Sequence, residues 1–526
     1  MTSILKYLNR ALLVLLLAAF AACSDNEGGN ESNGNGDDGN TETPADGDTY
    51  GYIKDTNGNP VEGVVVSDGY SCTATDAEGR YALTRNADAG FVFYSLPSAY
   101  KVSVDKTYKL PRFFARLQAG TARYDFTLEA LAAPEKRFDL ICIGDPQINE
   151  ASHAVRFKEE AGREIREYAA SAGVPCYGIT LGDHVNNKWT LFTNMVVALQ
   201  PEQTGVPVFA TIGNHDHEFP TADEKAARAK YESYFGPVDY SFNRGDVHVV
   251  SMDNVIHSCK ASADYEGGFT AAQYAWLKQD LSFVPKDKMV ILCVHIPFRG
   301  GWGTNSAHAD ADKYYDEVLD LLSQYEYAAI MSAHTHSNIN YIHRKNGKEI
   351  FEHVTGTTCG AWWRSTVCTE GTPIGFGLYR IDGNRMEEWA YRSVRHDEQF
   401  QIRLYRASDT FVGGAKYRFK QTGADQIVAN IWNWDPSWMV NVYENDVLSG
   451  QMTRNSDIDA WTVAYHIGLL NNTDSYRKSS DHMFHYTLKN PAAAVRVEAI
   501  DRFGNKYEQT VFTDPAEHPG DFHADF

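Results

Sequence analysis

The chain has 526 residues, of which 43% are hydrophobic and 13% aromatic, and its formal net charge is −21. This length exceeds one ordinary folding core, so we expect about two to four domains. The acidic balance argues against a nucleic-acid partner held through basic patches. No Cys-x-x-Cys pattern occurs among the eight cysteines, so a thiolate zinc site is not expected. The oligomeric state is left open.

Residues 1–22 are typical of a targeting segment. Lys6 and Arg10 precede an unbroken apolar run, Ala11 to Ala22, that is too short to span a membrane as a helix. The run ends in Phe20-Ala21-Ala22-Cys23, which resembles a bacterial lipoprotein signal with Phe where Leu is common. We therefore expect export and lipidation of Cys23 rather than simple secretion. The chain would be anchored to a bacterial membrane, with the outer membrane favoured, and would face the periplasm or the cell surface.

Residues 23–48 and 49–132 differ sharply in composition. The first stretch is Gly, Asn, Asp, Glu and Thr with almost no apolar residue, which predicts a disordered acidic linker after the anchor. The second has short alternating strands and turn residues, which predicts an N-terminal β-sandwich domain. Within it, Gly51–Lys54 and Val61–Val66 flank the turn Asp55–Pro60 and predict a hairpin.

Residues 136–396 alternate strands with helices, which predicts a layered α/β domain. The expected strands are Phe138–Ile143, Pro175–Leu181, Val206–Ile212, Tyr240–Asn243, Val247–Met252, Met289–Val294 and Ala328–Ser332. The expected helices are Ala154–Ala172, Leu191–Leu199, Ala222–Phe235, Thr270–Phe283 and Asp310–Tyr325. Antiparallel strands after Asn338 should complete a second sheet. In residues 397–526 the strands shorten and helical patterns vanish, which predicts a C-terminal all-β domain.

Five groups of polar side chains directly follow expected strands. They are Gly144-Asp145-Pro146-Gln147, Gly182-Asp183-His184, Gly213-Asn214-His215-Asp216, His295, and His334-Thr335-His336. Open α/β sheets place their ligand sites at the carboxyl ends of strands. Any one group could be structural, as an aspartate capping a helix or a histidine hydrogen-bonded in a core. Their recurrence at five strand exits favours a functional site.

In this order and form the five groups resemble the motifs of the calcineurin-like metallophosphoesterase family, over about Phe138 to Arg392. The segment Thr270–Leu277 also matches a family segment. The resemblance implies a four-layer α/β/β/α core, here flanked by two small all-β domains. It also implies two divalent metal ions, which would be Mn, Fe or Zn. Asp183 would bridge both ions, Asp145 and His336 would bind the first, and the second would be bound by Asn214, His295 and His334.

The implied reaction is hydrolysis of a phosphate monoester or diester, on a small phosphorylated substrate, by metal-bound hydroxide. His215 would protonate the leaving alkoxide or stabilise the transition state, and Asp216 would orient its ring. One alternative is a surface glycan- or protein-binding lipoprotein with a degenerate phosphoesterase core. Another is a nucleotide or pyrophosphate hydrolase.

The chain departs from the family pattern at Gln147, where histidine is usual, and at Ala333, where glycine is usual. An amide oxygen is a weaker ligand than imidazole, so Gln147 is either a ligand or a supporting residue. Weaker candidates for substrate contact are Arg299, Trp362, Trp363 and Arg364. His184, His217 and His353 are expected to have supporting or structural roles. Cys359 and Cys368 flank a loop and could form a disulfide in an oxidising compartment.

Overall fold

A computed structural model describes residues 47–299, 313–408, 419–421, 423–471 and 478–513. The expected signal segment, Cys23 and the acidic linker up to residue 46 lie outside the described residues. The residues from Asp46 to Phe526 form one compact unit. Within the described part of the chain, no helix is both long and apolar enough to cross a membrane.

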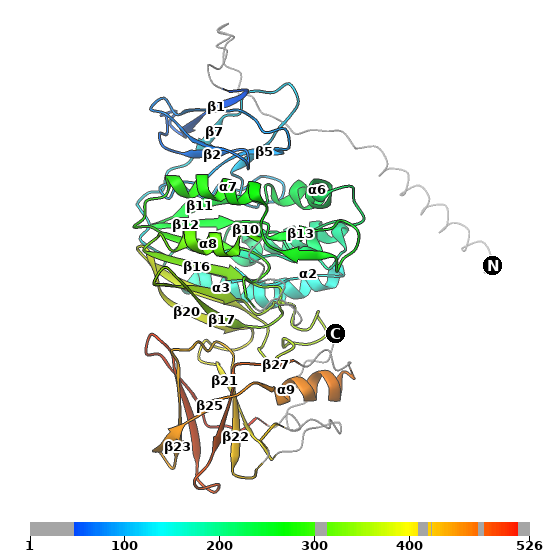
Figure 1. Ribbon diagram of the computed structural model, residues 1–526, viewed down its shortest axis with the longest axis vertical. Coiled ribbons are helices and arrows are strands. Elements are labelled where there is room, and N and C mark those ends of the chain that lie inside the picture. The colour runs from blue at the N-terminus through cyan, green and yellow to red at the C-terminus, as the bar shows by residue number, and fades with distance from the viewer. Residues whose placement is uncertain (1–46, 300–312, 409–418, 422, 472–477, 514–526) are drawn as a thin grey trace, which may run out of the picture. The chain divides into compact units, whose positions relative to one another are not determined.

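Two β-sheets form the centre of the unit (Figure 1). The first has the strand order β10-β9-β8-β19-β20, and the second has the order β11-β12-β15-β16-β18-β17. The first sheet contains β8 (Arg137–Ile143), β9 (Cys176–Leu181), β10 (Val208–Thr211), β19 (Gly375–Asp382) and β20 (Arg385–Ser393). The second contains β11 (Tyr240–Arg244), β12 (Val247–Ser251), β15 (Met289–Cys293), β16 (Tyr327–Ser332), β17 (Ile339–Lys345) and β18 (Lys348–Val354). In the first sheet β10, β9 and β8 run parallel, and β19 and β20 add antiparallel pairs at one side. In the second sheet β12, β15, β16 and β18 run parallel, and the antiparallel strands β11 and β17 form the two edges.

The strands after Asn338 divide between the two sheets. β17 and β18 extend the second sheet as expected, with β17 antiparallel to β18. β19 and β20 instead join the first sheet, where β19 pairs antiparallel with β8. The expectation of a single completed sheet is therefore corrected. β9 pairs with only one edge of β8, so the other edge of β8 was free to pair with β19.

Strand β8 shows how the layers stack. Leu140 and Cys142 belong to the core shared with the second sheet, whereas Ile141 and Ile143 pack with the helices on the other face. Successive strand residues point to opposite faces, so an apolar residue at every position buries both sides. One outer layer contains α2 (Ala151–Phe157), α3 (Arg163–Ser171), α4 (Phe192–Leu199), α5 (Pro201–Thr204) and α6 (Glu224–Phe235), and the other contains α7 (Ala271–Asp280) and α8 (Tyr315–Leu322). The expected four-layer α/β/β/α core is confirmed.

The helices largely follow the expected ranges, and their ends have local causes. Helix α7 begins after Thr270, whose hydroxyl accepts from the Gln273 backbone while the Gln273 side chain returns to Thr270. In Figure 1, α8 lies in front of strands of the second sheet. It begins at Tyr315, and the first residues of the expected helix, 310–312, lie outside the described residues. The expected helix from Ala154 to Ala172 is interrupted by a π-helical turn, Lys158–Gly162.

The N-terminal domain contains two small sheets, in the orders β4-β1-β7 and β3-β2-β5-β6. Their strands are β1 (Thr49–Asp55), β2 (Val65–Ser67), β3 (Cys72–Ala74), β4 (Arg80–Leu83), β5 (Phe91–Tyr94), β6 (Phe114–Arg116) and β7 (Phe126–Leu128). The expected hairpin forms only at its base, where Lys54 pairs antiparallel with Pro60, Asp55 N donates to Asn59 O at 2.8 Å and Val61 N donates to Ile53 O at 3.0 Å. Beyond Val61 the chain leaves β1 and crosses to the other sheet, where β2 pairs with β3 and β5.

The C-terminal domain is built mainly on two four-stranded sheets, in the orders β21-β22-β28-β25 and β24-β23-β29-β30. Their strands are β21 (Ile402–Arg406), β22 (Gln426–Ile431), β23 (Met439–Glu444), β24 (Val447–Gln451), β25 (Thr453–Arg454), β28 (Met483–Thr487), β29 (Val495–Ile500) and β30 (Lys506–Gln509). The all-β expectation is wrong at one place, where α9 (Ala460–Thr462) continues as a π-helical turn, Val463–Leu469. Asp459 begins this helix by accepting from the Thr462 backbone. The segment is rich in Trp, Val and Tyr, which favour strands, so composition pointed away from a helix.

Candidate metal centre

The five expected groups meet where strands of the two sheets end. Asp145 follows β8, Asp183 follows β9, and the 3-10 turn Asn214–Asp216 follows β10. His295 follows β15, and His334 follows β16. Left-handed φ angles occur at five residues of three of these exits, namely Asp145 (37°), Gln147 (37°), Asp183 (51°), His334 (65°) and His336 (53°). Such angles are uncommon outside glycine and turn the backbone sharply, which directs the side chains toward one point.

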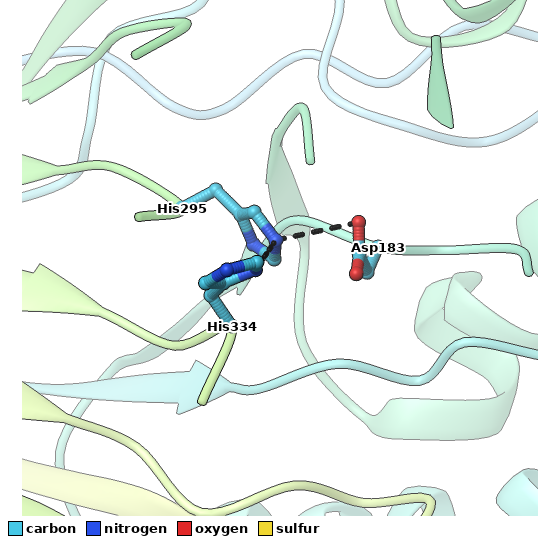
Figure 2. Close-up of side chains that lie close together, drawn as sticks. All are labelled: Asp183, His295 and His334. Atoms are coloured by element: carbon cyan, nitrogen blue, oxygen red, sulfur yellow. Dashed lines mark hydrogen bonds and ion pairs between the residues drawn. The ribbon is translucent and has the colours of Figure 1, made fainter. Parts of the chain in front are cut away.

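Asp183, His295 and His334 form the tightest part of the cluster. One ligand atom from each lies within 4.8 Å of the others, and all three residues are buried. Figure 2 shows both imidazoles directed toward the Asp183 carboxylate. His295 Nε2 lies 3.3 Å from Asp183 Oδ1, 3.0 Å from Asn214 Oδ1 and 3.1 Å from His334 Nδ1. Four of the expected ligands therefore share one small volume.

Asp145, Gln147 and His336 lie on the other side of Asp183. Gln147 Nε2 donates to Asp183 Oδ2 at 3.1 Å, and His336 Nε2 lies 3.8 Å from Asp145 Oδ1. Asp145 Oδ1 and Gln147 Oε1 are buried and have no hydrogen-bond partner among the described residues. A buried oxygen without a partner is costly, and a bound cation would satisfy both atoms. The residues present therefore fit a metal ion on this side as well.

The electrostatics of the cluster favour cation binding. Burial alone would lower the pKa of His295, but the neighbouring Asp183 outweighs it and raises that pKa to about 9. Burial lowers the pKa of His336 to about 4 and that of His334 well below its usual value. Both rings are thus neutral near pH 7, the form in which imidazole binds metals. Burial and repulsion from Asp183 raise the pKa of Asp145, despite opposing attraction from His295.

Backbone carbonyl groups fix the orientation of two of these histidines. His295 Nδ1 donates to Leu181 O at 2.7 Å, and His336 Nδ1 donates to Gly360 O at 3.1 Å. Each bond turns the Nε2 atom of its ring toward the carboxylates. Tyr265, on β14 (Tyr265–Gly267), lies 3.3 Å through its hydroxyl from His334 Nε2, which leaves His334 Nδ1 on the side of the cluster. The sequence contained no motif that singled out Tyr265.

Gly182 and Gly213 cannot carry a side chain, because the side chains of expected ligands lie close to their backbone. A Cβ atom at Gly213 would lie 2.3 Å from Asp183 Oδ1. At Gly182, where φ is +94°, a Cβ atom would lie 2.4 Å from His295 Nδ1. Both distances are below any real contact, so a side chain at either position would displace an expected ligand.

His215 and Asp216 do not interact as expected. His215 Nδ1 donates to Asn187 Oδ1 at 2.9 Å, and the His215 ring retains 23% side-chain exposure. The Asp216 carboxylate instead accepts from His184 Nδ1 and from the backbone N–H groups of His184, Val185 and Gly213. The expected orienting role of Asp216 is therefore wrong. Successive side chains of a 3-10 turn diverge, so Asp216 points inward. There its carboxylate links the loop after β9 to the loop after β10 through hydrogen bonds.

Asn187 is the residue that orients His215, and sequence reasoning missed it. Its position four residues after Asp183, in the same loop, was the only available signal. Its amide nitrogen donates to Ser262 Oγ at 3.0 Å, which fixes the amide with its oxygen toward His215.

The weaker candidates have different surroundings. Trp362 stacks on His336, with ring centroids 4.6 Å apart. Trp363 is buried, and its indole N–H donates to Pro146 O, so it serves packing rather than forming a wall over the centre. Arg299 is exposed, with its guanidinium 5.7 Å from the centroid of the Tyr341 ring. Arg364 is exposed on the turn after Trp363, and its contact with substrate stays a prediction.

The remaining histidines and cysteines have structural surroundings. His184 lies between Thr180 and Asp216, His217 between Gly213 and Asp253, and His353 near Asn340. Cys359 and Cys368 are both buried and free, so the expected disulfide is not formed. Cys368 instead packs against the Thr357 hydroxyl, and Cys359 lies 3.8 Å from His336 Nδ1.

Family models match most of the described chain. The models described as N terminal of Calcineurin-like phosphoesterase, Calcineurin-like phosphoesterase, and C terminal of Calcineurin-like phosphoesterase match residues 48–131, 124–338 and 352–507. Purple acid phosphatase 23 of Arabidopsis thaliana is 26% identical over 181 residues, which are 31% of this chain and 36% of that protein. Purple acid phosphatase 18 of the same plant is 25% identical over 182 residues, 32% of this chain and 38% of that protein. The chain thus spans about a third of the length of these curated relatives.

Solved structures with partial likeness include a purple acid phosphatase and a nucleotidase. Purple acid phosphatase PPD1 from yellow lupin has a TM-score of 0.36 and 14% identity, over 50% of this chain and 53% of that chain. The 5'-nucleotidase precursor from Thermus thermophilus has a TM-score of 0.30 and 10% identity, over 49% of this chain and 54% of that chain.

Proposed function

Because this chain belongs to the calcineurin-like phosphoesterase family, we propose that it hydrolyses a phosphate monoester or diester at a dinuclear metal centre. The observation that supports this most strongly is the meeting of buried carboxylates, amides and imidazoles at five strand exits, with two buried oxygens lacking any described partner. A purely structural cluster would leave those oxygens uncompensated.

The ligands divide between the two ions around Asp183. Asp145 and His336 would bind the first ion, and Gln147 Oε1 is suitably free to join them. The second ion would be bound by Asn214, His295 and His334. When bound, Mn, Fe or Zn ions supply Lewis-acid activation of water and neutralise charge on the phosphate oxygens.

His215 is the proton carrier in this proposal. Its Nδ1 is fixed by Asn187, its backbone N–H donates to Asp183 Oδ1 at 2.9 Å, and its Nε2 lies 4.0 Å from Asp183 Oδ2. The ring therefore stands at the border of the cluster, oriented but outside the tight ligand group. Its protonated Nε2 can donate to the leaving oxygen while Nδ1 keeps its bond to Asn187.

Assays of the purified chain with p-nitrophenyl phosphate and bis-p-nitrophenyl phosphate, in Mn²⁺, Fe²⁺ or Zn²⁺, test this function. His215→Ala should lower kcat by roughly 100-fold or more while the metal content stays unchanged. Asp183→Ala should lose both metal and turnover. His153→Ala, at a half-buried histidine that stacks on Trp363, is the matched control and should keep both. No turnover of either ester with fewer than one ion per chain would refute the enzyme, and metal loss in His215→Ala would refute the division of roles.

We also propose that the mature chain is exported and tethered to a bacterial outer membrane through lipid on Cys23, facing the periplasm or the cell surface. The support is the basic segment, the short apolar run and the cysteine that ends it. A wild-type chain should partition into detergent and a Cys23→Ser chain into water; equal partitioning would refute the anchor.

A further inference from the structure

A hollow lies between the core and the C-terminal domain, beside chain segments that follow two metal-ligand motifs. It has a volume of about 590 Å³, and we call it the arginine cleft. Its walls include Arg299, Asn338 and Tyr341 of the core and Trp434, Arg454 and His482 of the C-terminal domain, and two carboxylates, Glu370 and Asp481, also line it. Ser337, which also lines it, directly follows His336, and Arg299 lies four residues after His295. The wall of the cleft is thus built partly by the chain segments that directly follow two of the expected metal-ligand motifs.

Two arginines in the cleft have aromatic supports and no acidic partner. Arg454 lies over the Trp434 ring at 4.3 Å from its centroid, and Arg299 lies over the Tyr341 ring at 5.7 Å. Neither makes an ion pair within the described ranges, and both are exposed. A guanidinium stacked on a ring keeps its N–H groups free for a carboxylate or phosphate. By contrast, Arg344, which also lines the cleft, donates to Glu349 at 2.8 Å.

A buried polar atom at the cleft wall also lacks a partner. His482 is only 4% exposed, and its Nδ1 lies 2.7 Å from Asn430 Oδ1, yet its Nε2 has no hydrogen-bond partner in the described part of the chain. The nearest carboxylate oxygen, Glu370 Oε1, is 3.7 Å away and already accepts from Asn338 N and Thr372 Oγ1.

The core and the C-terminal domain are joined firmly beside this cleft. Asn338 Nδ2 donates to Trp432 O at 2.8 Å, and Asn340 Nδ2 donates to Asn433 O at 2.9 Å. Both asparagines lie just after the last metal-ligand motif and are buried. The segment that follows the last ligand motif is therefore hydrogen-bonded to the C-terminal domain at the wall of the cleft.

We propose that the arginine cleft binds a second anionic group of the substrate, so that the enzyme prefers phosphoesters carrying another phosphate or carboxylate on the alcohol portion. This inference rests on the proposed phosphoesterase function and adds a substrate class to it. Arg299 and Arg454 would bind the second anion from opposite domains, and the C-terminal domain would thereby form part of the substrate site.

The test compares fructose 1,6-bisphosphate with fructose 6-phosphate. The wild-type enzyme should show a kcat/KM at least about 10-fold higher for the bisphosphate, which corresponds to one charge-assisted contact. In Arg299→Gln/Arg454→Gln the ratio of the two kcat/KM values should fall to near one. Arg116→Gln, at an exposed arginine that stacks on Phe91 in the N-terminal domain, is the matched control and should keep the wild-type ratio.

A second measurement separates this inference from the proposed function. Metal-free protein should bind inorganic phosphate in calorimetry, and the double variant should bind it at least about 10-fold more weakly. Weaker phosphate binding by the variant, in a chain that hydrolyses no phosphoester, would support the cleft and refute the function. Turnover of p-nitrophenyl phosphate with no bisphosphate preference, and equal phosphate binding by wild type and variant, would overturn the cleft and leave the function standing.

Discussion

At the scale of single residues, the centre depends on backbone conformations that most side chains avoid. Asp145, Asp183, His334 and His336 all have φ between 37° and 65°. Each such residue costs on the order of 1–3 kcal/mol unless its surroundings hold it in place. The adjoining strands and the hydrogen bonds from His334 N to Asp145 Oδ2 and from Gln147 N to Asp183 O provide that restraint. The ligands are thus oriented by the fold before any ion binds.

Asn187 should control how well His215 works without affecting metal binding. Asn187→Leu removes the oxygen that accepts from His215 Nδ1, so the ring loses its orientation and kcat should fall by roughly 10-fold or more. KM and metal content should stay near wild type. Asn187→Asp keeps an acceptor at the same place and should restore most of the turnover at its own pH optimum. An Asn187→Leu enzyme with wild-type kcat would contradict this role.

The meeting of the five polar groups could be predicted from the residues, because each group follows a strand that apolar runs reveal, whereas their assignment as metal ligands came from the family resemblance. The partner of His215 could not. Asn214, His215 and Asp216 are adjacent in the sequence, and only the 3-10 turn decides that Asp216 faces His184 while His215 faces Asn187. The disulfide expected between Cys359 and Cys368 failed for a similar reason, since spacing along a loop does not determine where the two sulfur atoms point.

At the scale of elements, metal binding should be most sensitive to substitution in the turn that directly follows β9, at Gly182. Gly182→Ala adds a methyl group 2.4 Å from His295 Nδ1 at φ +94°, so it should greatly reduce metal content and turnover. Gly173→Ala is the matched control, because Gly173 also has positive φ (+71°) but has nothing within 4 Å of the added atom. It should lower thermal stability modestly and keep the metal. Equal metal content in the two variants would contradict the crowding argument.

Strands and helices of the core could be predicted because their apolar patterns are long and buried on defined faces. The expectations that the structure corrected concern short segments, whose conformation depends on their tertiary partners. The hairpin of the N-terminal domain extends only to Val61, because the chain then crosses to the other sheet, where β2 pairs with β3 and β5. The helix at Ala460–Thr462 was missed because its residues favour strands, and its Asp459 cap is a weak signal by itself.

At the scale of the whole molecule, stability should depend on pH through a buried carboxyl group. Burial and the neighbouring Asp253 raise the pKa of Asp239 to about 7, despite opposing attraction from Arg228. Between the unfolded pKa near 4 and about 7, the folded state therefore binds more protons, and stability is lost as the pH rises. Asp239→Asn removes this loss. Its thermal midpoint relative to wild type should rise between pH 5 and pH 8, and a constant difference would contradict the shifted pKa.

Contacts between the domains lay beyond sequence reasoning, because they join residues far apart in the chain. Ser365 Oγ lies 2.6 Å from His466 Nε2, and Arg403 donates to Gly371 O. Both bonds connect the C-terminal domain to the loop that follows the last strand of the second sheet.

The alternative of a binding lipoprotein with a degenerate core requires an incomplete ligand set, whereas only Gln147 departs from the expected ligand types.

The most direct test of the central claim is the metal content of the purified wild-type chain and of Asp183→Asn, measured by mass spectrometry alongside p-nitrophenyl phosphate turnover. Asp183 lies between the two groups of ligands, so both ions should depend on it. We predict about two divalent ions per wild-type chain. In Asp183→Asn we predict fewer than one ion per chain and no measurable turnover. An Asp183→Asn chain that keeps its ions and its turnover would contradict it.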